Sequence, residues 1–264
     1  IVIKMKKSTT LKLVSICLLM FLGFENLNAN NFPLPLKKNK KADDFKLTPI
    51  EHATAAFTWA GTQFYIDPVG GEAKFANQAK PNIILVTDIH GDHLDLATIT
   101  KVLTEVTKII VPQAVADKFP SEMKSKLTVI ANDQTITVDG FKITGVPMYN
   151  LREEAKNFHT KGRGNGYVIE KSGLRIYFSG DTEDIPEMRN LKNIDKAFIC
   201  MNLPYTMTED KAADAVLAFN PKQVYPYHYR GGKGLSDVAK FKELVNNGNS
   251  KIEVVQLNWY PSSK

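Results

Sequence analysis

The 264-residue sequence has little cysteine: it contains only Cys17 and Cys200. Cys17 lies in an N-terminal segment that we expect to be removed, and a single remaining thiol cannot form an internal disulfide. Cys200 stands in an apolar run of strand type, so we expect it to be a core residue. These features exclude a small disulfide-stabilised extracellular module and are typical of an exported bacterial protein.

The sequence also lacks a glycine-rich phosphate loop, a repeat of solenoid period and a low-complexity segment. Its net charge of +6 is modest, and half of it belongs to residues 1–29, which hold Lys4, Lys6, Lys7, Lys12 and Glu25. A net charge of about +3 on the mature chain is too small to indicate nucleic-acid binding. We therefore expect a small-molecule substrate and no nucleic-acid partner.

The N-terminal segment has the composition of a signal peptide. Lys6 and Lys7 precede an apolar run at residues 11–24, and Ala29 is a small residue at a plausible cleavage site. The alternative is an uncleaved membrane anchor, for which the apolar run is short. We predict a signal peptide at 1–29, a flexible linker at 30–46, one folded domain at 47–264, a periplasmic or secreted location, and no stable membrane anchor after cleavage.

Strand and helix patterns follow one another in two similar halves, each beginning with hairpins. We predict strands at 57–59, 63–68, 82–87, 108–111, 127–131, 135–138, 141–147, 166–170, 174–179, 197–201, 223–227 and 252–257, and helices at 94–106, 113–119, 185–191, 209–219 and 235–246. This order favours an α/β fold (α+β by some schemes): a four-layer αββα sandwich of two mixed sheets with outer helices. The alternative is a doubly wound single sheet, against which the hairpins argue.

One stretch concentrates metal-ligand side chains. The apolar strand that begins at Ile83 is followed directly by Asp88, His90, Asp92 and His93. Asp88 and His90 are two residues apart and share one side of an extended backbone, whereas Asp92 and His93 are adjacent and point to neighbouring places. Two metal ions close together suit this arrangement better than one.

Three further ligand-type residues border predicted strands, namely His159, Asp181 and His228. Together with the first stretch, this order resembles that of the metallo-β-lactamase superfamily. The runs at 158–167, 175–182 and 225–229 look like its branch related to the L-ascorbate-6-phosphate lactonases. The resemblance covers roughly residues 49–258.

The resemblance implies the αββα fold, a dinuclear metal site and hydrolytic activity. One ion would be bound by Asp88, His90 and His159, the other by Asp92, His93 and His228, with Asp181 shared by both. A hydroxide bridging the two ions would attack an ester, lactone, phosphodiester or amide. Asp92, Asp181 and His228 would be the catalytic residues around it. Zinc is the first expectation, with manganese or iron as alternatives.

Asp88 departs from the superfamily, which usually has histidine at this position. Two divalent ions carry four positive charges and the three carboxylates three negative ones, so a bridging hydroxide would bring the site to zero. The usual site would keep one positive charge. A less positive site holds the proton of its water more tightly and favours harder ions such as manganese or iron.

Other polar residues allow two interpretations each. Arg163, Arg230, Lys161 and Lys233 could hold an anionic substrate or lie at a solvated loop edge, and Tyr167, Tyr205 and Tyr229 could donate to an oxyanion or pack in the core. Of these, Arg163, Tyr205 and Arg230 are our candidate substrate contacts. We interpret His52 as a supporting residue, Asp95 as a carboxylate of the first helical turn, and Asp67 as a turn residue or a support of the site.

Two other functions stay open. An iron-dependent oxidoreductase would use the same fold and would show colour and iron after purification. A non-catalytic metal-binding protein is the third class, and the complete ligand set argues against it.

Overall fold

The computed structural model describes residues 44–261, so the predicted signal peptide and most of the predicted linker lie outside the described residues. Lys46, the last residue of that linker, already begins a strand, and the ring of Phe45 lies 5.1 Å from that of Phe57. In the described part of the chain, no helix is both long and apolar enough to cross a membrane.

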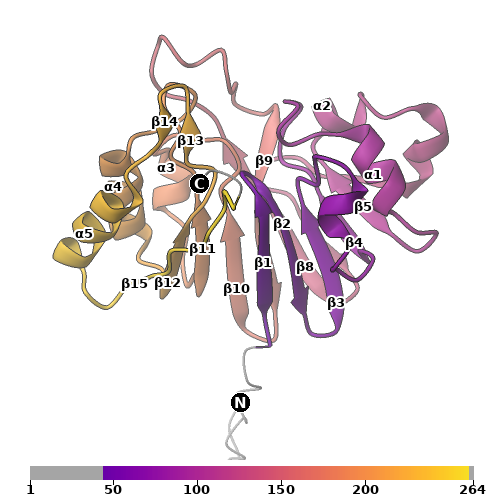
Figure 1. The fold of residues 1–264 in the computed structure, drawn as a ribbon, viewed down its shortest axis with the longest axis horizontal. Helices are drawn as coiled ribbons and strands as arrows, with labels where there is room; N and C mark the ends of the chain where they lie inside the picture. Colours follow the sequence, from indigo (N-terminus) through magenta and orange to yellow (C-terminus); the bar gives the residue numbers. More distant parts are fainter. Residues whose placement is uncertain (1–43, 262–264) are drawn as a thin grey trace, which may run out of the picture. The chain divides into compact units, whose positions relative to one another are not determined.

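The first sheet is mixed (Figure 1). Its six strands stand in sequence order: β1 (Lys46–Glu51), β2 (Thr54–Trp59), β3 (Thr62–Ile66), β4 (Ile83–Leu85), β5 (Lys108–Val111) and β6 (Leu127–Val129). The pairs β1–β2 and β2–β3 are antiparallel, and the pairs β3–β4, β4–β5 and β5–β6 are parallel. Ala60 and Gly61 turn the β2–β3 hairpin with positive φ angles of 49° and 74°, the backbone that a tight hairpin turn needs.

The second sheet is also mixed and begins as a meander. Its seven strands stand in the order β15 (Glu253–Val254), β12 (Gln223–Pro226), β11 (Lys196–Ile199), β10 (Leu174–Phe178), β9 (Gly164–Lys171), β8 (Phe141–Met148) and β7 (Thr135–Val138). Strands β7 to β10 pair antiparallel, and β10, β11, β12 and β15 pair parallel. A separate small hairpin is formed by β13 (Arg230–Gly231) and β14 (Gly234–Leu235).

The two sheets pack face to face through aromatic residues. Phe57 of β2 stacks on Phe178 of β10 at 5.6 Å between ring centroids, and Phe64 of β3 meets Phe141 of β8 edge-on at 4.9 Å. In β4, Ile83 and Leu85 belong to this central core, whereas Ile84 faces the outer helices. Because successive side chains of a strand point to opposite faces, the single apolar run of β4 contributes to the central core and to the core under the helices.

Helices cover the outer face of each sheet. They are α1 (Leu96–Val102), α2 (Gln113–Ala116), α3 (Pro186–Arg189), α4 (Glu209–Phe219) and α5 (Val238–Gly248), with 3₁₀ turns η1 (Glu72–Phe75) and η2 (Ser121–Lys126). In Figure 1, α1 and α2 lie beside the first sheet, and α3, α4 and α5 beside the second. The predicted four-layer αββα sandwich is confirmed, and the single doubly wound sheet is excluded.

Several sequence-based boundaries were wrong. Helix α1 spans only seven of the thirteen residues predicted for it, because Asp95 caps it at the start and Leu103 leaves the helix with an extended backbone. Strand β1 and the β13–β14 hairpin were not predicted. Cys200 is a fully buried free thiol, as predicted.

Candidate metal centre

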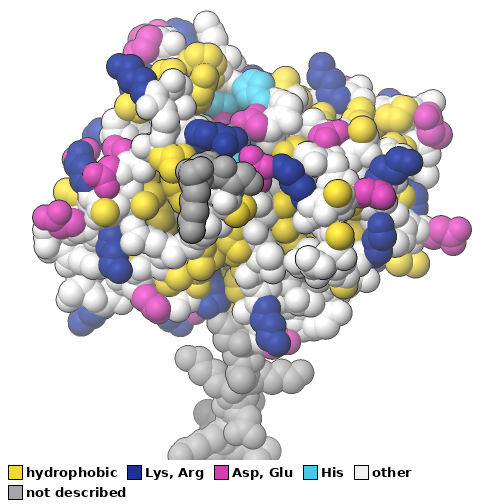
Figure 2. Space-filling view, viewed as in Figure 1, with side chains coloured by type: hydrophobic (Ala, Val, Ile, Leu, Met, Phe, Trp, Pro, Cys, Tyr) yellow, Lys and Arg dark blue, Asp and Glu magenta, His cyan; other side chains and the backbone are white. Residues whose placement is uncertain are grey.

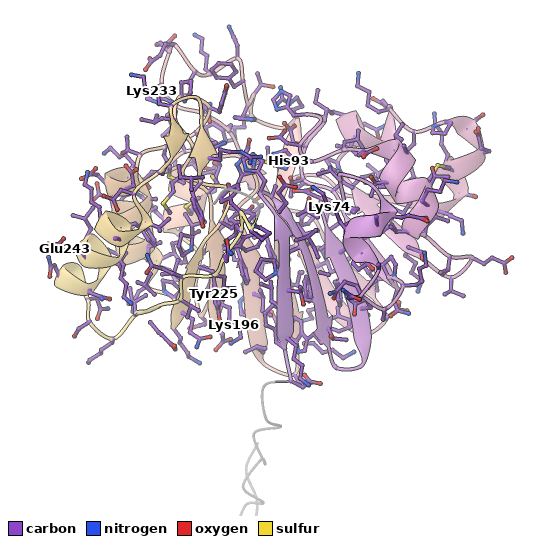
Figure 3. The ribbon with its side chains drawn as sticks, viewed as in Figure 1. Lys74, His93, Lys196, Tyr225, Lys233 and Glu243 are labelled. Atoms are coloured by element: carbon purple, nitrogen blue, oxygen red, sulfur yellow. The ribbon has the colours of Figure 1, made fainter. Side chains whose placement is uncertain are left out.

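The ligand-type residues meet at one end of both sheets. Asp88, Asp181 and His228 each follow a strand, namely β4, β10 and β12, and His159 lies in the loop before β9. Figure 3 shows His93 at this end of the central strands, and Figure 2 shows histidine side chains reaching the surface there. Carboxyl ends of parallel strands are where open α/β sheets build their sites.

One group of four side chains surrounds a common point. The ligand atoms of Asp92, His93, Asp181 and His228 lie within 4.8 Å of one another. The Nε2 atom of His228 lies 3.3 Å from Asp92 Oδ2, 3.3 Å from Asp181 Oδ1 and 3.1 Å from His93 Nε2. We name this set the four-ligand group.

A second group has three members. Atoms of Asp88, His90 and His159 also lie within 4.8 Å of one another. The Nδ1 atom of His90 is 2.8 Å from Asp88 Oδ2, and the Nε2 atom of His159 is 4.0 Å from the same oxygen. We name this set the three-ligand group.

Asp181 lies between the two groups. Its Oδ2 atom is 3.1 Å from His159 Nε2 in the three-ligand group and 3.4 Å from His93 Nε2 in the four-ligand group. Gly180 precedes it with a φ of 61°, and a Cβ there would come within 2.6 Å of the Met148 sulfur. Glycine is therefore needed for the turn that carries Asp181 into the site.

Donor atoms of the site lack the hydrogen bonds that burial normally requires. His159 Nε2 and Asp181 Oδ1, both of which face the ligand groups, are buried without a hydrogen-bond partner, although His159 and Asp181 approach to 3.1 Å. Buried polar atoms are rarely left unpaired. Imidazole and carboxylate groups that converge on one place fit a divalent transition metal ion, with zinc, manganese and iron all compatible with these donors.

The electrostatics of the site also favour a cation. Burial opposes the charged form of His93, yet the carboxylates of Asp181, Asp67 and Asp92 raise the pKa of His93 well above its ordinary value. Burial likewise opposes the charged form of Asp181, and the histidines at 228, 93 and 159 bring the pKa of its carboxyl well below the ordinary value. The carboxylates thus favour positive charge in the centre, and a metal ion bound there would supply it and displace protons from the histidines.

Asp67 orients His93. Its buried carboxylate lies 2.8 Å from His93 Nδ1 and accepts hydrogen bonds from the Thr87 backbone N–H and hydroxyl, both at 2.7 Å. This contact assigns a ring proton to Nδ1 and turns Nε2 toward the four-ligand group, as carboxylate partners of metal-binding histidines commonly do. Asp67 directly follows β3, which pairs with β4. This position at the end of a strand is the feature of the sequence that indicates a supporting role.

His52 supports Asp92 from the other side. The Tyr260 hydroxyl lies 2.7 Å from His52 Nδ1, and His52 Nε2 lies 3.4 Å from Asp92 Oδ2. Burial lowers the pKa of His52 to about 4, so the ring is neutral at neutral pH. Its ring also packs on that of His228 at 3.8 Å, which agrees with the supporting role expected for it.

Three residues of the centre have a left-handed backbone. His52, Asp67 and His228 have φ angles of 57°, 44° and 48°. Such conformations cost about 1–3 kcal/mol each for residues other than glycine and cluster at functional sites. Asp95, by contrast, accepts the Thr98 N–H at 3.1 Å as an N-cap and belongs to neither group.

The three candidate substrate contacts lie in different surroundings. Arg163 holds the Asp88 carboxylate, with Nε 2.9 Å from Oδ1 and Nη2 2.7 Å from Oδ2. Arg230 lies over the Tyr260 ring at 4.9 Å and 3.7 Å from Glu51. Tyr205 is 40% exposed and meets Phe158, the neighbour of His159, edge-on at 5.4 Å.

The hydroxyls of Tyr167 and Tyr229 are already engaged in hydrogen bonds. The hydroxyl of Tyr167 donates to the Val86 carbonyl, and that of Tyr229 to the Leu257 carbonyl. Core packing is therefore the correct interpretation for both.

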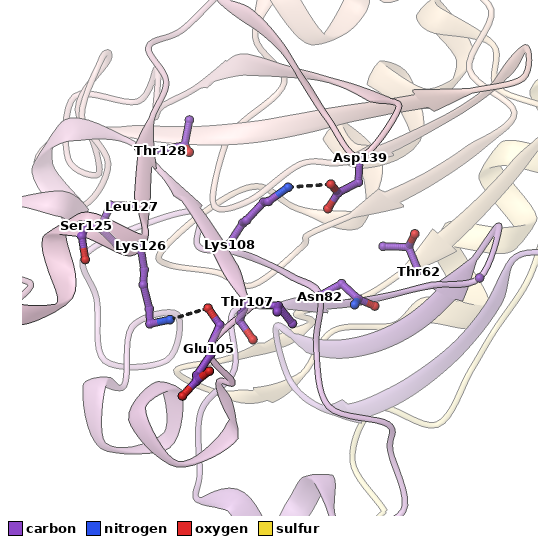
Figure 4. Close-up of a pocket in the computed structure, with 12 residues that line it drawn as sticks. Thr62, Asn82, Glu105, Thr107, Lys108, Ser125, Lys126, Leu127, Thr128 and Asp139 are labelled. Atoms are coloured by element: carbon purple, nitrogen blue, oxygen red, sulfur yellow. Dashed lines mark hydrogen bonds and ion pairs between the residues drawn. The ribbon is translucent and has the colours of Figure 1, made fainter.

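A pocket of about 780 Å³ lies at the opposite end of the first sheet, near the starts of β4, β5 and β6 (Figure 4). Lys108 pairs there with Asp139 at 2.6 Å, and Lys126 donates to the backbone carbonyls of Thr104 and Glu105. Its cations are thus already engaged, and none of the residues that line it is a histidine or cysteine. The candidate metal ligands lie at the other end of the sheet.

Comparison with known proteins agrees with this fold and centre. A family model described as the beta-lactamase superfamily domain matches residues 46–228, more than half of the chain. The chain belongs to the metallo-β-lactamase superfamily, and within it to the metal-dependent hydrolases.

Relatives are found among both sequences and structures. A UPF0173 metal-dependent hydrolase of Thermococcus onnurineus is 33% identical, over 77% of this chain and 92% of its own length. The crystal structure of a protein from Parabacteroides distasonis named as a metal-dependent hydrolase is 37% identical, with a TM-score of 0.73 over 82% of this chain and 94% of its own. CmlA, a diiron β-hydroxylase from Streptomyces venezuelae, shares the fold at 18% identity, with a TM-score of 0.62 over 81% of this chain and 53% of its own. None of these three relatives is named as an L-ascorbate-6-phosphate lactonase.

Proposed function

We propose that this metal-dependent hydrolase binds two divalent ions and cleaves an ester, lactone, phosphodiester or amide bond of a small molecule. The observation that carries the proposal is the pair of ligand groups that share Asp181, with buried histidine nitrogens lacking any other partner. Two ions bound there would supply an activated water and polarise the oxygen of the scissile bond.

The chain's own residues fix where those events take place. Asp67 holds the His93 ring, and His52 faces Asp92, so that the four-ligand group is positioned before substrate arrives. Such preorganisation places donors where charge develops. Asp181 keeps the two groups at a fixed spacing.

The substrate contacts are part of the proposal. Arg230 precedes the turn of the β13–β14 hairpin, and Lys233 stands at the tip of that hairpin in Figure 3. These two cations can meet an acidic group of the substrate. The exposed Tyr205 and Phe158 rings can contact an apolar part of it.

The test is metal analysis of protein purified from its native host, followed by a hydrolysis screen on the same sample. The screen should cover esters, lactones (a phosphorylated lactone included), phosphodiesters and amides. We expect close to two ions per chain. One ion or fewer after reconstitution with zinc and with manganese would overturn the two-ion proposal.

An iron-dependent oxidoreductase is the second candidate. Three carboxylates in the ligand set suit a hard ion such as iron, and CmlA has the same fold with a diiron site. Colour and bound iron without hydrolysis in the screen would favour this candidate. Bound metal without colour or turnover would favour a non-catalytic metal-binding protein.

We also propose that the protein is exported, on the composition of residues 1–29. The intact mass of protein isolated from the periplasm tests this. A mass that still includes residues 5–29 would contradict cleavage.

A further inference from the structure

Asp88 is held by both of its oxygens. The carboxylate is completely buried, and Arg163, 75 residues later in the chain, binds it through Nε and Nη2 in a side-on fork. The Arg163 side chain is itself only 17% exposed and also donates to the Phe158 carbonyl. Paired Arg–carboxylate contacts of this kind are strong and fix the geometry of both partners.

The fork leaves Asp88 facing the metal centre. Its Oδ2 atom, besides accepting from Arg163, lies 2.8 Å from His90 Nδ1 and 4.0 Å from His159 Nε2. A carboxylate oxygen can accept more than one partner. Asp88 therefore joins the arginine to the three-ligand group.

The charge of the pair differs from the charge of Asp88 alone. A carboxylate in place of the usual neutral histidine makes the centre one unit more negative, and the guanidinium 2.7 Å from its oxygen restores that unit. With Arg163 counted, the formal charge of the centre equals that of a site with a neutral ligand. Arginine stays protonated at any ordinary pH.

We propose that Asp88 and Arg163 form one neutral ligand unit for the ion of the three-ligand group, with Arg163 as its positioning residue. The inference rests on the proposed two-ion function. It explains how Asp88 can stand at this position without changing the charge of the centre, and it assigns Arg163 to the metal rather than to an anionic substrate.

Four proteins test the proposal: wild type, Asp88→His, Arg163→Gln and the Asp88→His/Arg163→Gln double variant. Each is loaded with cobalt(II) or zinc, challenged with increasing chelator, and read by metal stoichiometry and by the cobalt absorption spectrum. Asp88→His leaves the partly buried guanidinium of Arg163 without its carboxylate partner beside a divalent ion. We expect it to bind the weaker ion about 10- to 100-fold less tightly, the usual cost of losing a partner around a metal site. The double variant should retain two ions at the chelator concentration where Asp88→His retains one.

Matched controls separate charge from folding. Lys161→Gln removes a cation of the same loop that pairs with Glu187 and contacts neither ligand group. Added to Asp88→His, it should not restore the second ion. If Asp88→His fails to fold, Asp88→Asn takes its place, because it removes the same charge at nearly unchanged volume. Adding Arg163→Gln to Asp88→Asn should then restore the second ion in the same way.

The outcomes are distinguishable. Two ions in the wild type and also in Asp88→His, or no rescue in the double variant, would overturn the neutral unit and leave the two-ion function standing. One ion in the wild type and two in Arg163→Gln would show that the ion pair blocks the position. That result would overturn this inference and the proposed two-ion function of the native chain together.

Discussion

The two ligand groups of the centre differ in how firmly the protein holds them. In the four-ligand group, His93 and His228 are completely buried, Asp67 fixes the His93 ring, and His52 lies against Asp92. In the three-ligand group, Arg163 holds the buried Asp88 carboxylate, but His90 is 39% exposed and neither ring nitrogen of His159 has a hydrogen-bond partner. We therefore expect the four-ligand group to bind an ion more firmly than the three-ligand group.

This difference shows which ligand group the protein orients more strongly through supporting contacts. Supporting partners raise metal affinity by orienting ligands before the ion arrives. The firm group draws on strand ends of both sheets, whereas the weaker group takes Asp88 and His90 from the segment after β4 and His159 from the loop that also carries Arg163. A position that depends on a loop can exchange its ion more readily.

The largest effect should come from Asp181→Asn, because this side chain serves both groups. We expect loss of the three-ligand ion, weakened binding of the other ion, and a fall in hydrolysis well beyond the about 100-fold that the loss of a supporting partner costs. Metal content and turnover should be measured on the same preparation. Retention of both ions at wild-type affinity would remove Asp181 from the shared position.

Asp67→Asn should affect the four-ligand group alone. The amide keeps the size of the carboxylate but weakens its contact with His93 Nδ1, so the affinity for that ion should fall by about 10- to 100-fold. The three-ligand ion should keep its own affinity. A chelator titration followed by cobalt absorption resolves the two ions.

The control for that experiment is Asp95→Asn. Asp95 is an N-cap of α1 outside both groups, and asparagine caps a helix as well as aspartate does. Metal binding and thermal stability should both stay unchanged. Equal losses in the two variants would mean that Asp67 acts on the fold rather than on His93.

Much of this architecture could be predicted from local pattern. The hairpin of β2 and β3, and α4 with its limits at Glu209 and Phe219, follow from apolar periodicity and turn residues. Strand β1 was missed because its exposure alternates irregularly and its start at Lys46 adjoins a lysine-rich segment. The β13–β14 hairpin has two residues in each strand and leaves no periodic signal.

The candidate ligands could be found because they lie in the segments that border predicted strands and follow the ligand order of the superfamily. The contacts of Arg163 with Asp88 and of Tyr260 with His52 could not, since they join distant parts of the chain. Arg163 reaches Asp88 across 75 residues and Tyr260 reaches His52 across 208. A charge count made from the ligands alone omits Arg163, and only the fold brings this cation to the centre.

Wild-type protein should lose its two ions in separate steps. We expect the ion of the three-ligand group to leave at a chelator concentration at least about tenfold lower, a difference that corresponds to about 1.4 kcal/mol. Stoichiometry during dialysis against graded chelator measures this. A single step that removes both ions together would show that the two groups are held equally and would contradict the comparison.

Cys200 provides the smallest expected effect and reports whether the firm group holds its structure without metal. Burial raises the pKa of the Cys200 thiol to about 12, and the neighbouring Asp181 carboxylate adds to the rise. Its Sγ atom donates to the carbonyl of Thr182, directly after Asp181. Because only the thiolate reacts, a thiol reagent at pH 8 should leave the folded protein unmodified, and reaction in the folded state should increase only as the pH nears 12.

Removal of both ions should not change that result if the fold, rather than the metal, orders the four-ligand side of the centre. Complete reaction is then expected only after unfolding in denaturant, which supplies the positive control. Measurable reaction at pH 8 in the metal-free protein, absent from the loaded protein, would show that the residues around Asp181 open when the ions leave. The side chains of the four-ligand group would then be ordered by the metal rather than by the fold. The two ligand groups would differ only in their affinity for an ion.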